Sequence, residues 1–196
     1  MKHAILFDLD VSVDGSPVPS AGPAMLSPLT DLRGAFDVRT GVVTTFERWS
    51  RAVRVIGLVV GQPLVELTRE RHTIAVNSGF ALPHGAPDDV LLISGRCVPT
   101  LPEALDLGPG EALVEKASGH LVAWRTTIDR AGSLRDGSRA TPARVSVIDR
   151  RVLLTRPWHV RTLRDGAIAS DLESLASTPT AIPPGVVMIG AHPIAI

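Results

Sequence analysis

The chain has 196 residues, of which 44% are hydrophobic, and its acidic and basic side chains balance to a formal net charge of zero. This length and composition suit one globular domain with a full core, and the balanced charge argues against a nucleic-acid-binding protein, which usually has a basic excess. No apolar run reaches the roughly 20 residues that a membrane helix needs, and the short, acidic N-terminus does not resemble a signal peptide. We therefore expect a cytoplasmic protein without a nucleic-acid or membrane partner.

Signatures of a zinc or thiolate metal site and of a serine or cysteine nucleophile are missing from the sequence. Cys97 is the single cysteine, which excludes a disulfide framework and a thiolate metal site. The six histidines show neither HxH nor HExxH spacing, so a zinc site is not supported. No GxSxG elbow occurs, and nucleophilic catalysis therefore has no basis in the sequence.

A continuous apolar run at residues 4–7 predicts a buried strand of a parallel sheet. Asp8 and Asp10 follow it, at the end of the strand where open α/β sheets place their ligands. Two such carboxylates can share one Mg²⁺ ion. The same pair resembles the motif of dehalogenase-type phosphatases, although Ser12 stands where that motif has threonine or valine. The alternative interpretation places both acids in a solvated loop.

The most distinctive stretch, residues 26–49, is LSPLTDLRGAFDVRTGVVTTFERW. Arg33 and Arg39 flank a short loop, and a helix is predicted to follow with Thr44 or Thr45 as its cap. A helix N-terminus offers N–H groups to an anion, and arginine adds planar donors for phosphate. The stretch therefore predicts a phosphate-handling segment.

The remaining elements follow in chain order. On the helix after residue 44, Glu47, Arg48 and Arg51 are expected to face solvent. Strands are predicted at residues 53–60, 72–76 and 90–93, a helix at 64–71, a short connection or helix at 99–107, a hairpin at 112–125 about a Ser-Gly turn, and a strand or short helix at 145–154. Residues 128–142 are polar and predict a mobile excursion.

Two later segments also concern the site. Ser94-Gly95-Arg96 ends a predicted strand and places a cation at the ligand edge of the sheet, or else forms a tight turn with a solvated arginine. Asp165-Gly166 predicts a turn, which puts Asp171 near the start of the helix that follows.

Residues 178–196 are rich in proline and glycine and end in one rung of a hexapeptide-like repeat. One rung cannot bury its own apolar face, so several must stack. We therefore divide the chain into a domain at residues 1–177 and a linker with a first β-helix rung at 178–196, and we expect that the natural chain continues beyond Ile196. The other interpretation is an ordinary final strand.

Taken together, these segments resemble the N-terminal domain of sugar nucleotidyltransferases similar to the bifunctional enzyme that makes UDP-N-acetylglucosamine, in which a left-handed β-helix follows. The resemblance covers nearly the whole chain. The residues that carry it are, in order, Leu26, Pro28, Leu29, Thr30, Arg33, Arg39, Gly41, Glu47 and Trp49, then Ser94-Gly95-Arg96, Pro157-Trp158 and Asp171-Leu172.

The chain departs from the family pattern at several positions. The Gly-rich GxGTR loop before a lysine is absent, and Gly34 stands where the family has proline. Ser94 replaces an asparagine, and the metal-binding aspartate of that strand end is missing. Lys116 follows Val-Glu as in the family, but no proline comes after it, which favours coincidence.

The resemblance implies a three-layer α/β fold, Rossmann-like as in nucleotide-diphospho-sugar transferases, with a mostly parallel sheet. It implies transfer of a nucleotidyl group from an NTP to a sugar phosphate with release of pyrophosphate, Mg²⁺ as cofactor, and a homotrimer if a β-helix follows. Arg33 and Arg39 would be catalytic. The substrate-binding set would be Pro28, Leu29, Thr30, Ser94, Gly95, Arg96 and Asp171, with Asp8 and Asp10 as candidate metal ligands.

Two other functions stay open at this point. A catalytically degenerate domain would bind a nucleotide sugar or serve only as a scaffold, and the missing glycine loop and aspartate favour it. A phosphatase would use Asp8 and Asp10.

Overall fold

The computed structural model describes residues 2–9, 11–13, 23–134 and 139–175. Asp10, the proposed linker and the β-helix rung at residues 178–196 lie outside these ranges, so the predictions made for them are not tested.

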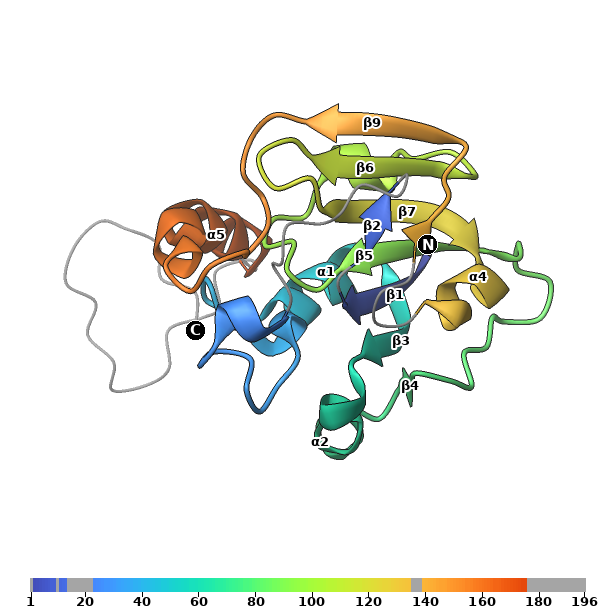
Figure 1. The fold of residues 1–196 in the computed structure, drawn as a ribbon, viewed down its shortest axis with the longest axis horizontal. Coiled ribbons are helices and arrows are strands. Elements are labelled where there is room, and N and C mark those ends of the chain that lie inside the picture. Colours follow the sequence, from blue (N-terminus) through green and yellow to red (C-terminus); the bar gives the residue numbers. More distant parts are fainter. Residues whose placement is uncertain (1, 10, 14–22, 135–138, 176–196) are drawn as a thin grey trace, which may run out of the picture.

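Seven strands of the described chain form one sheet in the order β4-β3-β1-β5-β7-β6-β9 (Figure 1). Their bounds are β1 His3–Asp8, β3 Arg54–Val60, β4 Ala75–Val76, β5 Asp89–Ser94, β6 Glu111–Glu115, β7 Leu121–Thr127 and β9 Arg144–Ile148, while β2 (Ser12–Val13) pairs separately with β8 (Arg139–Ala140). Only β7 runs against its neighbours, and the other pairs are parallel. The carboxyl ends of all these sheet strands except β7 therefore meet at one edge.

Strand β1 lies at the centre of the sheet because its apolar residues are covered on both faces. Ala4 and Leu6 belong to one buried cluster, and Ile5 and Phe7 belong to the cluster on the opposite face. This arrangement explains the unbroken apolar run, because a strand that is buried on both faces has apolar side chains at every position rather than at every second one. The predicted first strand is confirmed.

Helices cover both faces, which gives the three layers that the resemblance implied (Figure 1). Their bounds are α1 Thr45–Ala52, α2 Val65–Arg71, α3 Pro102–Leu105, α4 Ile128–Ser133 and α5 His159–Leu175, with short 3₁₀ turns at Pro23–Leu26, Ala35–Asp37 and Gln62–Leu64. Trp49 of α1 and Ala104 of α3 pack on the face of Leu6, whereas Ala131 of α4 packs on the face of Phe7. The α/β class and the mostly parallel sheet are therefore confirmed.

The predicted elements at residues 53–60, 64–71, 72–76, 90–93 and 112–125 are confirmed, with ends shifted by a few residues. The predicted mobile excursion at residues 128–142 is wrong in its first half, which forms α4. Ala131 and Leu134 are buried there against the sheet, and this burial keeps the segment ordered although most of its residues are polar.

The predicted turn at Asp165-Gly166 is also wrong, because both residues lie inside α5. Nothing lies within 4 Å of a Cβ built at Gly166, so this glycine faces open space on the helix surface. Asp171 consequently lies toward the C-terminal end of a long helix rather than near the start of a short one.

Across the described ranges, no helix combines the length and the apolar character required to cross a bilayer.

Replacing Gly166 tests the helix assignment directly. Alanine at an open helix position should raise the free energy of unfolding by about 1 kcal/mol, because glycine loses more backbone entropy on folding. Gly119 is the matched control, since its surroundings are equally open but its φ is +70°. Gly119→Ala should cost about 1–2 kcal/mol. Urea unfolding measures the free energy of unfolding of both variants. A loss of stability in Gly166→Ala would contradict the helix assignment and favour a turn at Asp165-Gly166.

Candidate functional site

The segment after β1, residues 23–44, lies beyond the carboxyl ends of the parallel strands (Figure 1). Asp8 at the end of β1 holds it in place. The Oδ2 atom of Asp8 accepts the Ala35 N–H at 2.7 Å, and the Oδ1 atom accepts Arg96 Nε–H at 3.1 Å. Because Asp8 and Arg96 are 1% and 3% exposed, this charged pair lies inside the protein. It joins the loop after β1 to the loop after β5.

The ring of Phe36 fills the space above these two strand ends. Gly95 donates its N–H to Phe7 O at 2.7 Å, and a Cβ at Gly95 would lie 2.8 Å from the Phe36 ring. A Cβ at Gly34 would lie 2.5 Å from the same ring. After β1 the chain forms β3 and β4 on one side of β1, and it then crosses to form β5 on the other side. The carboxyl ends of β1 and β5 are therefore the switch point of the sheet, where open α/β sheets usually bind ligands. In this protein a side chain occupies it.

The predicted substrate-binding residues therefore fall into two environments. Thr30, Ser94 and Arg96 are buried, and the Ser94 hydroxyl accepts the Arg96 N–H at 3.3 Å. Pro28 is exposed, and Leu29 packs partly against the cluster under α5.

The two predicted catalytic arginines are both exposed. Arg33 lies on the loop before Phe36, and Arg39 forms an isolated bridge with Thr44 just before α1. The guanidinium groups of these two residues face solvent, whereas that of Arg96 is buried against Asp8.

Helix α1 begins with a capping box rather than with open amides. The Thr44 hydroxyl accepts the Glu47 N–H at 3.1 Å, and the Glu47 carboxylate accepts the Thr44 N–H at 2.7 Å. Just before the helix, the N–H groups of Val42 and Val43 donate to Asp171 at 2.8 and 3.1 Å. The prediction that this helix start holds phosphate is corrected, because side chains of the protein already occupy these amides.

Arg48 and Asp171 form a second buried ion pair, which fastens α5 to α1. Arg48 Nε and Nη2 donate to the two Asp171 oxygens at 2.7 and 2.8 Å, and Arg48 Nη1 donates to Val98 O at 2.9 Å. The expectation that Arg48 faces solvent is wrong, because α5 covers that side of α1. Burial opposes ionisation of Asp171, but hydrogen bonds from Arg48 and the Val43 amide outweigh it and lower the pKa.

The candidate metal ligands do not form a metal site in the described part of the chain. Groups of three or more His, Cys, Asp or Glu side chains placed to hold a metal ion are absent from it. Asp8 bonds Arg96 instead, which leaves its oxygens unsuited to Mg²⁺ and its carboxylate inaccessible as a phosphatase nucleophile. Cys97 is fully buried, and this burial raises the pKa of its thiol, which disfavours the reactive thiolate.

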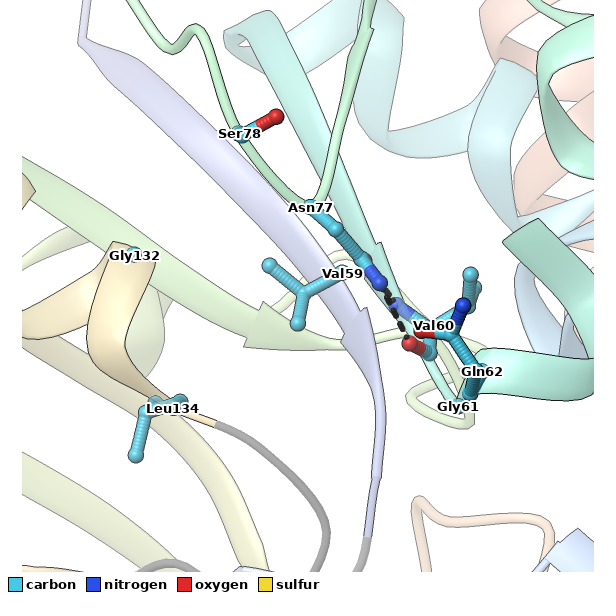
Figure 2. Close-up of a pocket in the computed structure, with 8 residues that line it drawn as sticks. All are labelled: Val59, Val60, Gly61, Gln62, Asn77, Ser78, Gly132 and Leu134. Carbon is cyan, nitrogen blue, oxygen red and sulfur yellow. Dashed lines mark hydrogen bonds between the residues drawn. The ribbon is translucent and has the colours of Figure 1, made fainter.

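An open pocket of about 410 Å³ lies farther along the same edge, at the carboxyl ends of β3 and β4 (Figure 2). Eight uncharged residues line it: Val59, Val60, Gly61, Gln62, Asn77, Ser78, Gly132 and Leu134. Figure 2 shows Val59 on one side and Gly132 and Leu134, at the end of α4, on the other. The pocket therefore offers backbone groups, the amide side chains of Gln62 and Asn77, the Ser78 hydroxyl and apolar surface to a neutral ligand group.

Asn77 gives this pocket a fixed wall. Its Oδ1 atom accepts the Val60 N–H at 2.8 Å and its Nδ2 atom donates to Val60 O at 2.9 Å, so the side chain extends the sheet as a strand would (Figure 2). Its φ of +63° is a conformation that asparagine adopts more readily than most residues. Gln62 and Ser78 are exposed beside it.

None of these pocket residues was among the sequence-predicted site residues. The available signal was their position after two predicted strands, since ligands of parallel sheets gather at carboxyl ends. Gly61-Gln62-Pro63 looked only like a turn, and the loop from Asn77 looked only like a connection.

Residues 20–179 match the model of a family described as sugar nucleotidyl transferase, which is more than half of the chain. A search of curated protein sequences finds no match.

Neutralising Asp171 should destabilise the fold and change its response to acid. Asp171→Asn leaves the buried Arg48 charge uncompensated, at a cost of about 3–5 kcal/mol. Because folding lowers the Asp171 pKa, its contribution is complete above the ordinary value of 3.8 and disappears as the pH falls toward the folded pKa. Urea unfolding between pH 7 and pH 3 should therefore show a shallower loss of stability in Asp171→Asn than in the unmodified protein.

The exposed neighbour Glu173 on the same helix supplies the control, and Glu173→Gln should leave stability at pH 7 within about 0.5 kcal/mol. Equal stability of Asp171→Asn and Glu173→Gln would contradict the structural role of the Arg48–Asp171 pair.

Proposed function

Because the chain belongs to the sugar nucleotidyl transferase family, we propose that it transfers a nucleotidyl group from an NTP to a sugar 1-phosphate. A phosphate oxygen of the sugar phosphate attacks the α-phosphorus of the NTP. The bond from that phosphorus to the oxygen bridging to the β-phosphate breaks, and pyrophosphate leaves with the electron pair. Such a reaction depends on positioning and on charge stabilisation more than on covalent chemistry.

The uncharged pocket at β3 and β4 is the observation that carries this proposal. Its volume of about 410 Å³ lies in the range of roughly 300–1,000 Å³ that is usual for ligand pockets. A pocket without cations does not suit a triphosphate, but it suits a base and ribose that hydrogen-bond to backbone groups and to Gln62. We assign it to the nucleoside of the NTP.

The exposed arginines of the segment after β1 are assigned to the phosphates. Arg33 and Arg39 are exposed on the segment that lies beyond the carboxyl ends of the parallel strands, and the pocket lies at the same edge of the sheet. Arg96, Ser94 and Gly95 are assigned to supporting that segment. Arg96 bonds Asp8, Gly95 lies against Phe36, and Ser94 accepts the Arg96 N–H. Family members commonly use Mg²⁺, but Asp8 does not fit it, and we assign no step to a metal.

A second function, binding of a nucleotide sugar without catalysis, is favoured by the switch point that Phe36 fills. Phe36 lies where the ligand of an open α/β sheet usually lies, and Asp8 is committed to Arg96. A domain that binds a nucleotide sugar without turning it over would tolerate both features. Turnover separates this alternative from the transferase.

Pyrophosphate release from the four common NTPs, each with a panel of hexose 1-phosphates and Mg²⁺, tests the transferase. Arg33→Ala should lower kcat/KM roughly 10- to 100-fold, because a hydrogen bond to a charged phosphate contributes about 1.5–3 kcal/mol. Its melting temperature should not change, since Arg33 is exposed. Arg54→Ala removes an exposed arginine from the opposite edge of the sheet and should leave the rate unchanged. Equal effects of the two variants would remove Arg33 from the site.

Nucleotide binding by calorimetry tests the pocket. Gln62→Ala should weaken NTP binding about 5- to 10-fold by removing one neutral hydrogen bond. Glu66→Ala, an exposed change nearby on α2 outside the pocket lining, should not weaken it. Binding without pyrophosphate release would favour the non-catalytic alternative, and absence of any nucleotide binding would contradict both functions.

A further inference from the structure

A second pocket, of about 360 Å³, lies at the carboxyl ends of β6 and β9, beside the start of α5. Its lining differs in kind from that of the first pocket, because it contains basic side chains and no acidic one. The residues are Ala117, Ser118, His120, Arg151, Thr155, Arg156, Trp158 and His159. None of them is among the sequence-predicted site residues, although Trp158 is one of the residues that carry the resemblance.

The two arginines differ in how far their charge is already compensated. Arg151 lies 3.7 Å from the buried carboxylate of Glu115 and donates to the Thr155 hydroxyl at 3.3 Å. Arg156 contacts the Met25 sulfur at 3.0 Å and lies 6.0 Å from the centre of the Trp158 ring, and both of these partners are uncharged. Within the described residues, no carboxylate pairs with Arg156. This guanidinium therefore has a charge available for an anion.

His159 adds a neutral donor to this pair. Its Nδ1 atom accepts the Thr155 N–H at 3.2 Å, which leaves Nε2 as the proton-bearing atom of the ring. Burial, together with the nearby charges of Arg151 and Arg156, lowers the His159 pKa. At neutral pH the ring is therefore uncharged, and its Nε2–H is a hydrogen-bond donor.

Trp158 supplies the apolar part of the pocket. Its side chain is 65% exposed, whereas Trp49 and Trp124 are 0% and 2% exposed. A large ring held in solvent beside cations offers a flat apolar surface to a ligand that also carries an anion.

We propose that this pocket binds the phosphate group of a phosphorylated sugar, with Arg156 at the phosphate and the sugar ring against Trp158. The anion part of this assignment rests on the geometry alone, and the sugar part rests on the proposed function.

The pocket is separate from the uncharged pocket on β3 and β4. Strands β3 and β6 are four positions apart in the sheet order, and neighbouring strands are about 4.8 Å apart, which gives roughly 19 Å along the edge. A nucleoside and a sugar phosphate bound at these strands contact different residues. Binding of one can therefore be measured while the other is present.

Tryptophan fluorescence reports on this pocket because Trp158 is the exposed tryptophan. Titration with α-D-glucose 1-phosphate should give a saturable change, inorganic phosphate should give a weaker one, and glucose none. Arg156→Ala should raise the Kd at least tenfold. Arg150→Ala removes a neighbouring exposed arginine that pairs with Glu103 outside this pocket, and it should leave the Kd unchanged.

The melting temperature of each variant shows whether it is folded. Trp158→Phe, measured by calorimetry, is a second test: it should bind glucose 1-phosphate more weakly but bind inorganic phosphate as the unmodified protein does. A titration without saturation by either phosphate compound, or equal affinity in Arg156→Ala and the unmodified protein, would overturn the proposal. If glucose 1-phosphate binds as expected while no NTP yields pyrophosphate, the transferase function fails and this site stands.

Discussion

The buried carboxylate of Asp8 is the contact on which the arrangement of the ligand edge depends. It accepts the Ala35 N–H from one loop and Arg96 from another, and so it holds Phe36 over the ends of β1 and β5. A charge that is 1% exposed is tolerated only when it is paired and hydrogen-bonded in this way. With the centre of the edge filled, ligand space remains on either side of it, at β3 and β4 and at β6 and β9.

The two pockets at this edge of the sheet differ in charge, because different residues follow the strands that end beside each of them. Uncharged residues after β3 and β4 line the first, whereas Arg156, His159 and Trp158 line the second. We propose the neutral pocket as the place of the nucleoside and the basic pocket as the place of the sugar phosphate. The chain belongs to the sugar nucleotidyl transferase family although the Phe36 ring fills the switch point of its sheet.

Local patterns predicted much of the fold, and long-range pairing explains most of what they missed. The apolar run before Asp8 and the cap at Thr44 need only neighbouring residues to be recognised, and both are confirmed. Arg48 pairs with a residue 123 positions away, so its side of the helix looked solvated. Gly166 reads as a turn next to Asp165, but the packing of α5 on the cluster that contains Ala167 keeps the helix continuous. The pocket residues carry no motif and became visible only when strand ends were brought together.

A crystal structure with a non-hydrolysable NTP analogue tests the central claim most directly. The account predicts base and ribose density in the pocket formed by Gly61, Gln62 and Ser78, with Phe36 still packed on Gly95. Density for the nucleoside at the ends of β1 and β5, with Phe36 displaced, would contradict it.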